Sequence, residues 1–181
     1  AAAAAGWPVV AVAGVALTAG VILGAVNAAL ITAARIPPII ATLATLTLYR
    51  HALIHISGGR WINLPVEFRE WGTRGPLGLS VGVWLAVAVA ILVAVAARWS
   101  TLGRAIYAVG SNAQAAEHMG IRPHQVRLAV YTGMGLLTGL AAFAYASRWS
   151  AIQTNTGQGF EMVVITAVVV GGTNIFGGSG R

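Results

Sequence analysis

Two histidines spaced one helical turn apart, His51 and His55, are the first candidates for chemistry in this sequence. At positions i and i+4 of a helix they share one face, which is a spacing that can hold a metal ion. Their neighbour in sequence is Arg50, and no carboxylate or third histidine stands near them. The pattern therefore favours an interfacial pair over a metal site, and we expect no metal here.

The glycine-rich end of the chain, GGTNIFGGSGR, could be interpreted as one of two kinds of catalytic site. A phosphate-binding loop needs GxxxxGK[ST], and the chain contains no lysine, so ATP hydrolysis is not expected in this chain. Ser179 in a GxSG-like turn is compatible with an intramembrane serine protease, which requires a histidine at the same depth. The two histidines are predicted at the opposite membrane face, which disfavours the protease. A sharp bend between membrane segments is the expected role of these glycines.

Uncharged polar side chains inside the apolar runs are the remaining chemical signal. Hydroxyl and amide groups in such places can hydrogen-bond to a sugar-like solute, or they can join helices to each other. Both readings stay open at this point. The candidates for a solute path are Asn27, Thr42, Thr45, Thr47 and Thr166.

The composition indicates a membrane protein. Of 181 residues, 57% are hydrophobic and only 8% are charged, whereas soluble domains carry about 25% charged residues. The net charge of +7 comes from arginines that mostly sit at the ends of apolar runs. This placement is typical of lipid-facing anchors and argues against nucleic acid as a partner. The absence of cysteine excludes disulfides and thiolate metal sites.

The apolar runs predict an all-α polytopic transmembrane bundle with about five segments. The expected spans are residues 7–34, 38–56, 81–97, 128–147 and 160–175. The last is short and followed by Gly171-Gly172, so it is expected to be broken or re-entrant. Residues 57–79 and 148–159 are expected to be loops. Both chain ends stop abruptly, which predicts a fragment, residues 1–181, of one longer membrane domain.

Small residues predict where the spans pack. Gly20 and Gly24 form a GxxxG step in the first span, and Gly133, Gly135 and Gly139 lie in the fourth. Such residues allow close helix approach in lipid. The distribution of arginine over alternate loops predicts that residues 98–127 face the cytoplasm.

Residues 98–127 form a polar segment between two apolar spans, and they predict two short helices. Ser100 and Thr101 can cap the first, around residues 105–109, and residues 110–112 are expected to break it. A second helix is expected at residues 112–119, ended by Gly120, with Pro123 preventing its continuation. It would present Gln114, Glu117 and His118. From these residues alone, a docking element and a plain solvated connector are equally compatible.

Three motifs carry a resemblance to a known family. GRAIYAVGSNAQAAEHMGI, residues 103–121, resembles the cytoplasmic loop of sugar-importing ABC transporter permeases of the ribose/xylose/arabinose type. IPPIIATL at residues 36–43 and GGTNIFGG at residues 171–178 resemble two further motifs of that family, in the same order. The positions that fill the loop pattern are Gly103, Arg104, Tyr107, Ala108, Gly110, Asn112, Ala115, Ala116, Gly120 and Ile121.

The resemblance implies a membrane permease subunit that imports a monosaccharide or similar small polar solute by alternating access, in the bacterial plasma membrane. Residues 98–127 would be its cytoplasmic coupling loop. It implies docking on an ABC ATPase subunit through Asn112, Gln114, Ala115, Ala116, Glu117, His118 and Gly120. Further implied partners are a second permease and an extracytoplasmic sugar-binding protein. ATP and Mg²⁺ would bind the ATPase, and no cofactor would bind this chain.

The main rival is a secondary transporter or channel. Such proteins are expected to carry a functional intramembrane carboxylate or an inverted repeat. Only Glu161 qualifies, and no repeat is evident. The intramembrane protease is a more distant rival.

Overall fold

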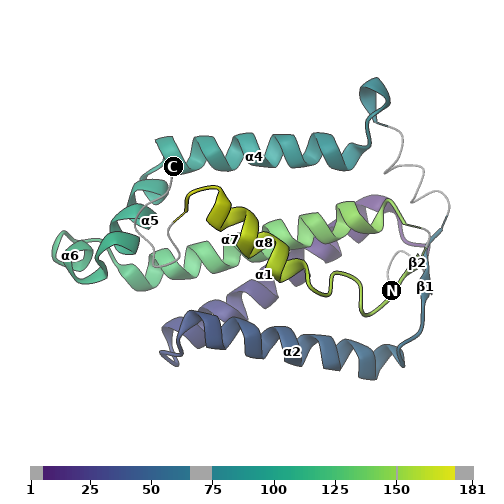
Figure 1. The fold of residues 1–181 in the computed structure, drawn as a ribbon, viewed down its shortest axis with the longest axis horizontal. Coiled ribbons are helices and arrows are strands. Elements are labelled where there is room, and N and C mark those ends of the chain that lie inside the picture. The colour runs from purple at the N-terminus through teal and green to yellow at the C-terminus, as the bar shows by residue number, and fades with distance from the viewer. Residues whose placement is uncertain (1–5, 66–74, 150, 174–181) are drawn as a thin grey trace. The chain divides into compact units, whose positions relative to one another are not determined.

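The computed structural model describes residues 6–65, 75–149 and 151–173 (Figure 1). These residues divide into two compact units. The first unit comprises residues 1–89 and 128–156, and the second comprises residues 90–127 and 157–181. Each unit is described by itself. Residues 66–74 of the expected loop 57–79, and Ser179 in the expected glycine-rich bend, lie outside the described residues.

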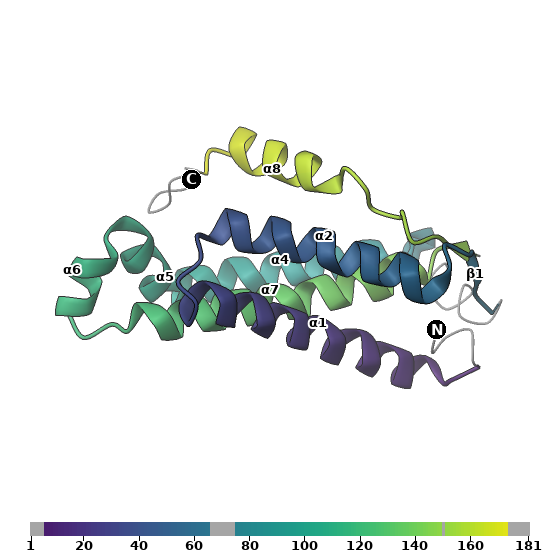
Figure 2. The same ribbon diagram turned by 90° about the horizontal axis from the view of Figure 1, so that it is seen from below.

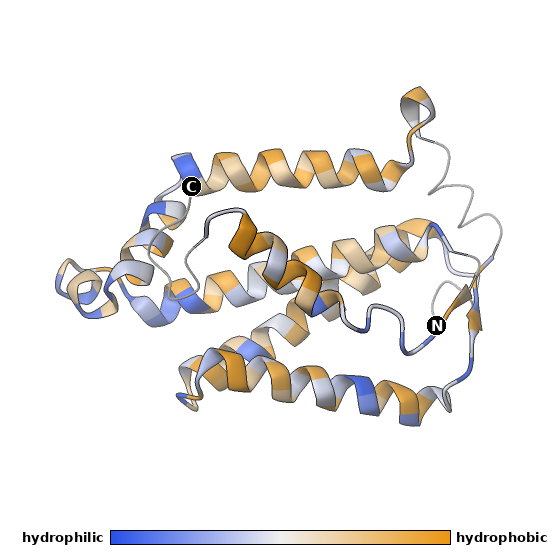
Figure 3. Cartoon of the chain, viewed as in Figure 1, coloured by the Kyte–Doolittle hydropathy of each residue, from blue (hydrophilic) through white to orange (hydrophobic). Residues whose placement is uncertain are grey.

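The described elements are helical apart from two short strands, so the predicted all-α class is confirmed. Four of the described helices are long and apolar enough to cross a membrane: α1 Val9–Thr32, α2 Pro38–Ser57, α4 Val81–Trp99 and α7 Pro123–Ala146. Figure 3 shows apolar residues along α4 and hydrophilic residues gathered around α5 and α6. The four full-length spans predicted from hydropathy are therefore present.

In the first unit, α1 and α2 run antiparallel and are joined by a short turn (Figure 2). Arg35 in this turn has φ +55, and Pro38 is the first residue of α2, where its missing N–H leaves no helix bond unmade. The expected boundary between the spans 7–34 and 38–56 is confirmed.

Helices α1 and α7 are in backbone contact through glycine. A Cβ placed on Gly24 would lie 2.5 Å from the carbonyl oxygen of Tyr131 and 2.9 Å from the Cα of Gly135. Gly20 approaches Gly135 and Gly139 in the same way. Close approach of this kind needs small residues on both helices. The prediction that Gly133 shares this face is wrong, because nothing lies within 4 Å of its missing Cβ.

One end of this unit is closed by an apolar cluster and a two-stranded sheet. Phe143 of α7, only 5% exposed, packs against Val9, Val12 and Ala16 of α1 and Leu64 beyond α2. Strand β1 (Ile62–Asn63) pairs antiparallel with β2 (Ala151–Ile152), with Ile62 opposite Ile152. Both segments were expected to be loops. Their pairing shows that the two loops lie at the same end of the unit, as alternating spans require. A 3-10 turn, η1 (Pro76–Gly78), precedes α4.

The second unit contains α5 (Thr101–Ser111), α6 (Ala113–His118) and α8 (Phe160–Val170), with the adjoining ends of α4 and α7. Gly110 and Ser111 are helical, so the expected break at residues 110–112 narrows to Asn112. Helix α7 begins at Pro123, five residues before the expected span. Helix α8 has 11 residues and stops before Gly171, which agrees with a segment too short for a simple crossing.

Candidate functional site

The polar segment between α4 and α7 folds as two capped helices. Ser100 caps α5, because its Oγ accepts a hydrogen bond of 2.9 Å from the Gly103 N–H. Asn112 serves both helices. Its N–H donates to the Ala108 carbonyl oxygen at 3.1 Å, and its Oδ1 accepts from the Ala115 N–H at 3.0 Å. A single residue therefore ends α5 and starts α6.

The far end of α6 is also fixed. The Ile121 N–H donates to the Ala116 carbonyl oxygen at 3.0 Å, and the Gly120 N–H donates to that of Glu117 at 2.9 Å. Gly120 has φ +85, a left-handed conformation that glycine adopts without steric cost. Three residues later Pro123 begins α7. Helix α6 is thus a six-residue helix with both ends held by backbone or side-chain hydrogen bonds.

The faces of α6 differ in exposure. Ala116 is 2% exposed and packs inward. Gln114, Ala115, Glu117 and His118 are exposed. Met119, which sequence reasoning did not select, is 81% exposed. An apolar side chain just before the terminating glycine of a polar segment is the signal that could have identified it. The exposed face is suited to protein contact, while Ala116 positions the helix.

Helix α5 lies directly against the end of α4. Gly103 is buried, and a Cβ there would meet the carbonyl oxygens of Ala96 and Ala97. No larger side chain fits at this position without moving the backbone. The orientation of α5, and of α6 beyond it, is therefore fixed by the last turn of α4.

A second candidate site is a cavity of about 380 Å³ between α1, α2 and α7. Its size falls in the range of small-molecule sites, about 300–1,000 Å³. Asn27, Thr42 and Thr45 line it, as predicted for a solute path, but Thr47 and Thr166 do not. The other lining residues are Gly20, Leu23, Gly24, Leu46, Tyr49, Tyr131, Met134, Gly135 and Thr138.

The excluded threonines satisfy their hydroxyls within their own helices. Thr47 Oγ1 donates to the Leu43 carbonyl oxygen at 2.7 Å, and Thr166 Oγ1 donates to that of Met162 at 2.8 Å. Thr45 Oγ1 also lies 3.1 Å from the Ala41 and Thr42 carbonyl oxygens of its own helix. Its shortest contact, however, is 2.7 Å to Asn27 Oδ1, to which it donates across the helix interface. The sequence left open whether such side chains line a solute path or join helices. Thr45 and Asn27 do both, because they form an interhelical hydrogen bond and line the cavity.

Tyr49 is one of the polar residues of this cavity that the sequence analysis did not select. Its hydroxyl is buried and has no hydrogen-bond partner among the described residues. A buried hydroxyl without a partner costs about 1–3 kcal/mol, which makes this cavity a natural place for water or a solute hydroxyl. The signal in the sequence is its spacing, four residues after Thr45 and seven after Thr42, which puts all three on one helix face.

The two histidines have no third potential metal ligand beside them among the described residues. His51 and His55 are exposed, and His51 Nδ1 lies 2.8 Å from the Thr47 carbonyl oxygen, to which its N–H can donate. No three His, Asp or Glu side chains gather among the described residues.

Comparison with known proteins gives a family match over almost the whole chain. The family described as "Branched-chain amino acid transport system / permease component" matches residues 1–178. The autoinducer 2 import system permease protein LsrC of Yersinia pseudotuberculosis serotype O:1b (strain IP 31758) is 37% identical over 166 residues, covering 91% of this chain and 47% of that protein. LsrC of Shigella flexneri is 37% identical over 165 residues (91% and 48%).

LsrC of Escherichia coli (strain K12 / DH10B) is 36% identical over 165 residues, covering 91% of this chain and 48% of that protein. The chain thus spans about half the length of these curated relatives. No solved structure matches it.

Proposed function

Since the chain belongs to the family of permease components of branched-chain amino acid transport systems, we propose that it forms part of the membrane subunit of an ATP-driven importer. It is a multi-pass protein of the bacterial inner membrane, and the resemblance to sugar-importing ABC permeases found in its motifs is confirmed. Its proposed role is transport, with ATP hydrolysis assigned to a separate subunit that holds the ATP and Mg²⁺.

The single observation that supports this proposal most is the geometry of α6. A short helix fixed at both ends by Asn112 and Gly120 can transmit a rigid-body movement, whereas a loose loop cannot. It exposes Gln114, Glu117, His118 and Met119, and its buried Ala116 anchors it. In the proposal this face docks on the ATPase, and closure of the ATPases shifts the membrane helices between outward and inward access.

The cavity between α1, α2 and α7 supports the proposed class of cargo. Its described lining contains hydroxyl and amide groups, including Asn27, Thr42 and Tyr49, and no charged side chain. Such a lining fits a small uncharged hydroxylated solute of the monosaccharide class, and it offers aromatic rings for the C–H faces of the solute. The relatives named above import autoinducer 2 according to their names, so autoinducer 2 and D-ribose are the probes of choice.

The complete importer is proposed to contain two permeases, two ATPases and an extracytoplasmic binding protein that delivers the solute. The paired loops carrying β1 and β2 are the proposed docking face for that protein, because positive-inside counting assigns them to the outer side.

The test is recovery of the ATPase subunit of the same transport system with the full-length permease. The variants Glu117→Arg and Gly120→Trp change the exposed face and the left-handed end of α6. Glu161→Arg is the matched control, since it makes the same charge change in α8. We expect the two α6 variants to lose the ATPase and the control to retain it.

Unchanged ATPase recovery with both α6 variants would contradict the docking assignment. Uptake of autoinducer 2 or D-ribose by proteoliposomes without ATP would instead favour a secondary transporter. Both measurements use the full-length permease, because the present chain covers about half of its relatives.

A further inference from the structure

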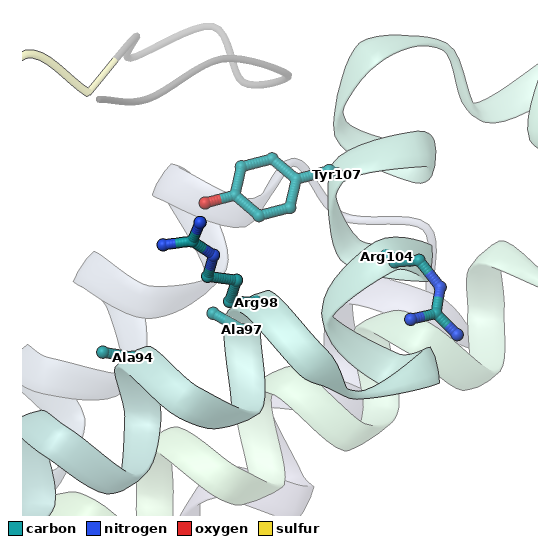
Figure 4. A pocket seen from close by; sticks show the side chains of 5 residues that line it. All are labelled: Ala94, Ala97, Arg98, Arg104 and Tyr107. Carbon is teal, nitrogen blue, oxygen red and sulfur yellow. The ribbon is translucent and has the colours of Figure 1, made fainter.

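A cavity of about 540 Å³ lies beside the last turns of α4 within the second unit. Arg98, Arg104 and Tyr107 line it on one side, and Ala94 and Ala97 form an apolar wall. Figure 4 shows the Arg98 guanidinium pointing toward the phenol oxygen of Tyr107, with Arg104 on the neighbouring helix pointing another way. The cavity therefore offers a guanidinium and a phenol O–H to one ligand group.

A second cavity, of about 580 Å³, adjoins the first and shares Arg104 as a wall. It adds Arg122 and Gln125, so the two cavities together present three guanidiniums. Its remaining lining residues are Thr101, Leu102, Ala105, Ala108, Ile121 and Val126. No acidic side chain is among the described residues that line either cavity, so their positive charge is not compensated locally.

The apolar surroundings distinguish this site from one for a free anion. Ile91 and Val95, in the turns of α4 that precede the first cavity, are exposed, and the described residues of α4 include no buried side chain. Trp99, 76% exposed, stands at the end of the same apolar run, the usual position of an interfacial aromatic residue. A ligand with a charged head and an apolar tail fits this arrangement.

We propose that the two cavities bind the headgroup of an anionic phospholipid at the cytoplasmic end of α4. A phosphate accepts hydrogen bonds from the Arg98 guanidinium and the Tyr107 phenol, and an acyl chain follows the exposed side of α4. Arginine suits this role, since its planar donors match phosphate oxygens and remain charged at all physiological pH values. A lipid with two phosphates can place the second against Arg104 and Arg122.

Diphosphatidylglycerol is accordingly the probe, and phosphatidylcholine is the zwitterionic reference. The measurement is lipid retained by the purified full-length permease, titrated in detergent and read by native mass spectrometry. The variant Arg98→Gln/Arg104→Gln removes the two guanidiniums of the first cavity. Its control, Arg35→Gln/Arg127→Gln, removes the same charge on the same predicted membrane face from two residues that line neither cavity.

We expect the first double variant to bind diphosphatidylglycerol about tenfold or more weakly, because it removes charge-assisted hydrogen bonds from guanidinium to phosphate. The control variant should bind as the original protein does. Tyr107→Phe, a milder change that preserves the ring, should weaken binding by a smaller factor, and Tyr145→Phe should leave it unchanged. The melting temperature in phosphatidylcholine checks that each variant is folded.

Equal loss in the two double variants would overturn the proposal, since it would reduce the effect to general surface charge. Equal retention of diphosphatidylglycerol and phosphatidylcholine by the original protein would also overturn it. Full displacement of the lipid by millimolar glycerol 3-phosphate would show a free-phosphate site and contradict the lipid assignment. None of these outcomes depends on whether the chain docks an ATPase.

Discussion

The hydroxyl of Thr45 and the side-chain oxygen of Asn27 lie 2.7 Å apart and join α2 to α1. Thr45 is 4% exposed, so the bond is shielded from water. Replacing both partners, Thr45→Val with Asn27→Leu, should cost less than the sum of the single changes. Interhelical hydrogen bonds in membrane proteins couple by about 0.6 kcal/mol on average, and we expect a coupling of that order. The measurement is a double-mutant cycle of unfolding free energies in bicelles.

Thr47→Val is the matched control for this cycle, because the Thr47 hydroxyl donates only within its own helix in the described structure. Combined with Asn27→Leu it should give additive free energies. A coupling of similar size for both pairs would contradict the interhelical bond.

The glycine contacts between α1 and α7 predict how alanine substitutions in α7 change the stability of the protein. Gly135→Ala should lower the free energy of unfolding by about 1–3 kcal/mol, because its Cβ would meet the backbone of Gly20 and Gly24. Gly133→Ala, two residues away in the same helix, has open space at that point. It should be neutral or slightly stabilising, since alanine forms helix better than glycine. Equal melting temperatures for the two variants would refute the packing register.

The unpartnered hydroxyl of Tyr49 leads to an expectation about transport. In the proposed full-length importer, Tyr49→Phe should raise the KM for the proposed cargo, autoinducer 2 or D-ribose, roughly two- to tenfold. This factor corresponds to the loss of one net hydrogen bond. Tyr145→Phe is the control, because that ring is exposed and stacks on Trp149 with a centroid distance of 5.7 Å. An unchanged KM in Tyr49→Phe would show that water alone satisfies this hydroxyl.

The cap shared by α5 and α6 can be tested by Asn112→Ala. Loss of an N-cap side chain costs about 1 kcal/mol, so the Ala115 N–H should exchange with solvent roughly fivefold faster. The proposed ATP-driven uptake by the complete importer should fall as well. Gln114→Ala changes an exposed neighbour and should leave the exchange of Ala115 unaltered. If Asn112→Ala leaves both exchange and uptake unchanged, α6 does not depend on its cap.

Much of the fold could be predicted from local sequence signals. Long apolar runs define their own helices, since lipid leaves no other way to satisfy the backbone, and the described ends of α1, α2 and α4 lie within two residues of the expected spans. The cap at Ser100 followed from residue type. The start of α7 did not, because residues 123–127 are polar and helical, and hydropathy detects only the apolar part of a helix.

The residues that depend on tertiary contacts were harder to predict. Gly133 and Gly135 are indistinguishable by type, and only the register of α7 against α1 separates them. Tyr49 reads as one more aromatic residue of an apolar helix until the neighbouring helices bury its hydroxyl. The pairing of Ile62 with Ile152 joins segments about ninety positions apart, and no local pattern in either short strand indicates its partner.

The close contact of Gly103 with the carbonyls of Ala96 and Ala97 gives the second unit a mechanical property. Helix α5 contacts the backbone of α4 directly at Gly103. Asn112 ends α5 and caps α6, so no flexible residue separates these two helices. The end of α4, α5 and α6 are therefore connected without a flexible linker between them. A displacement of α6 is expected to move the last turn of α4 with it.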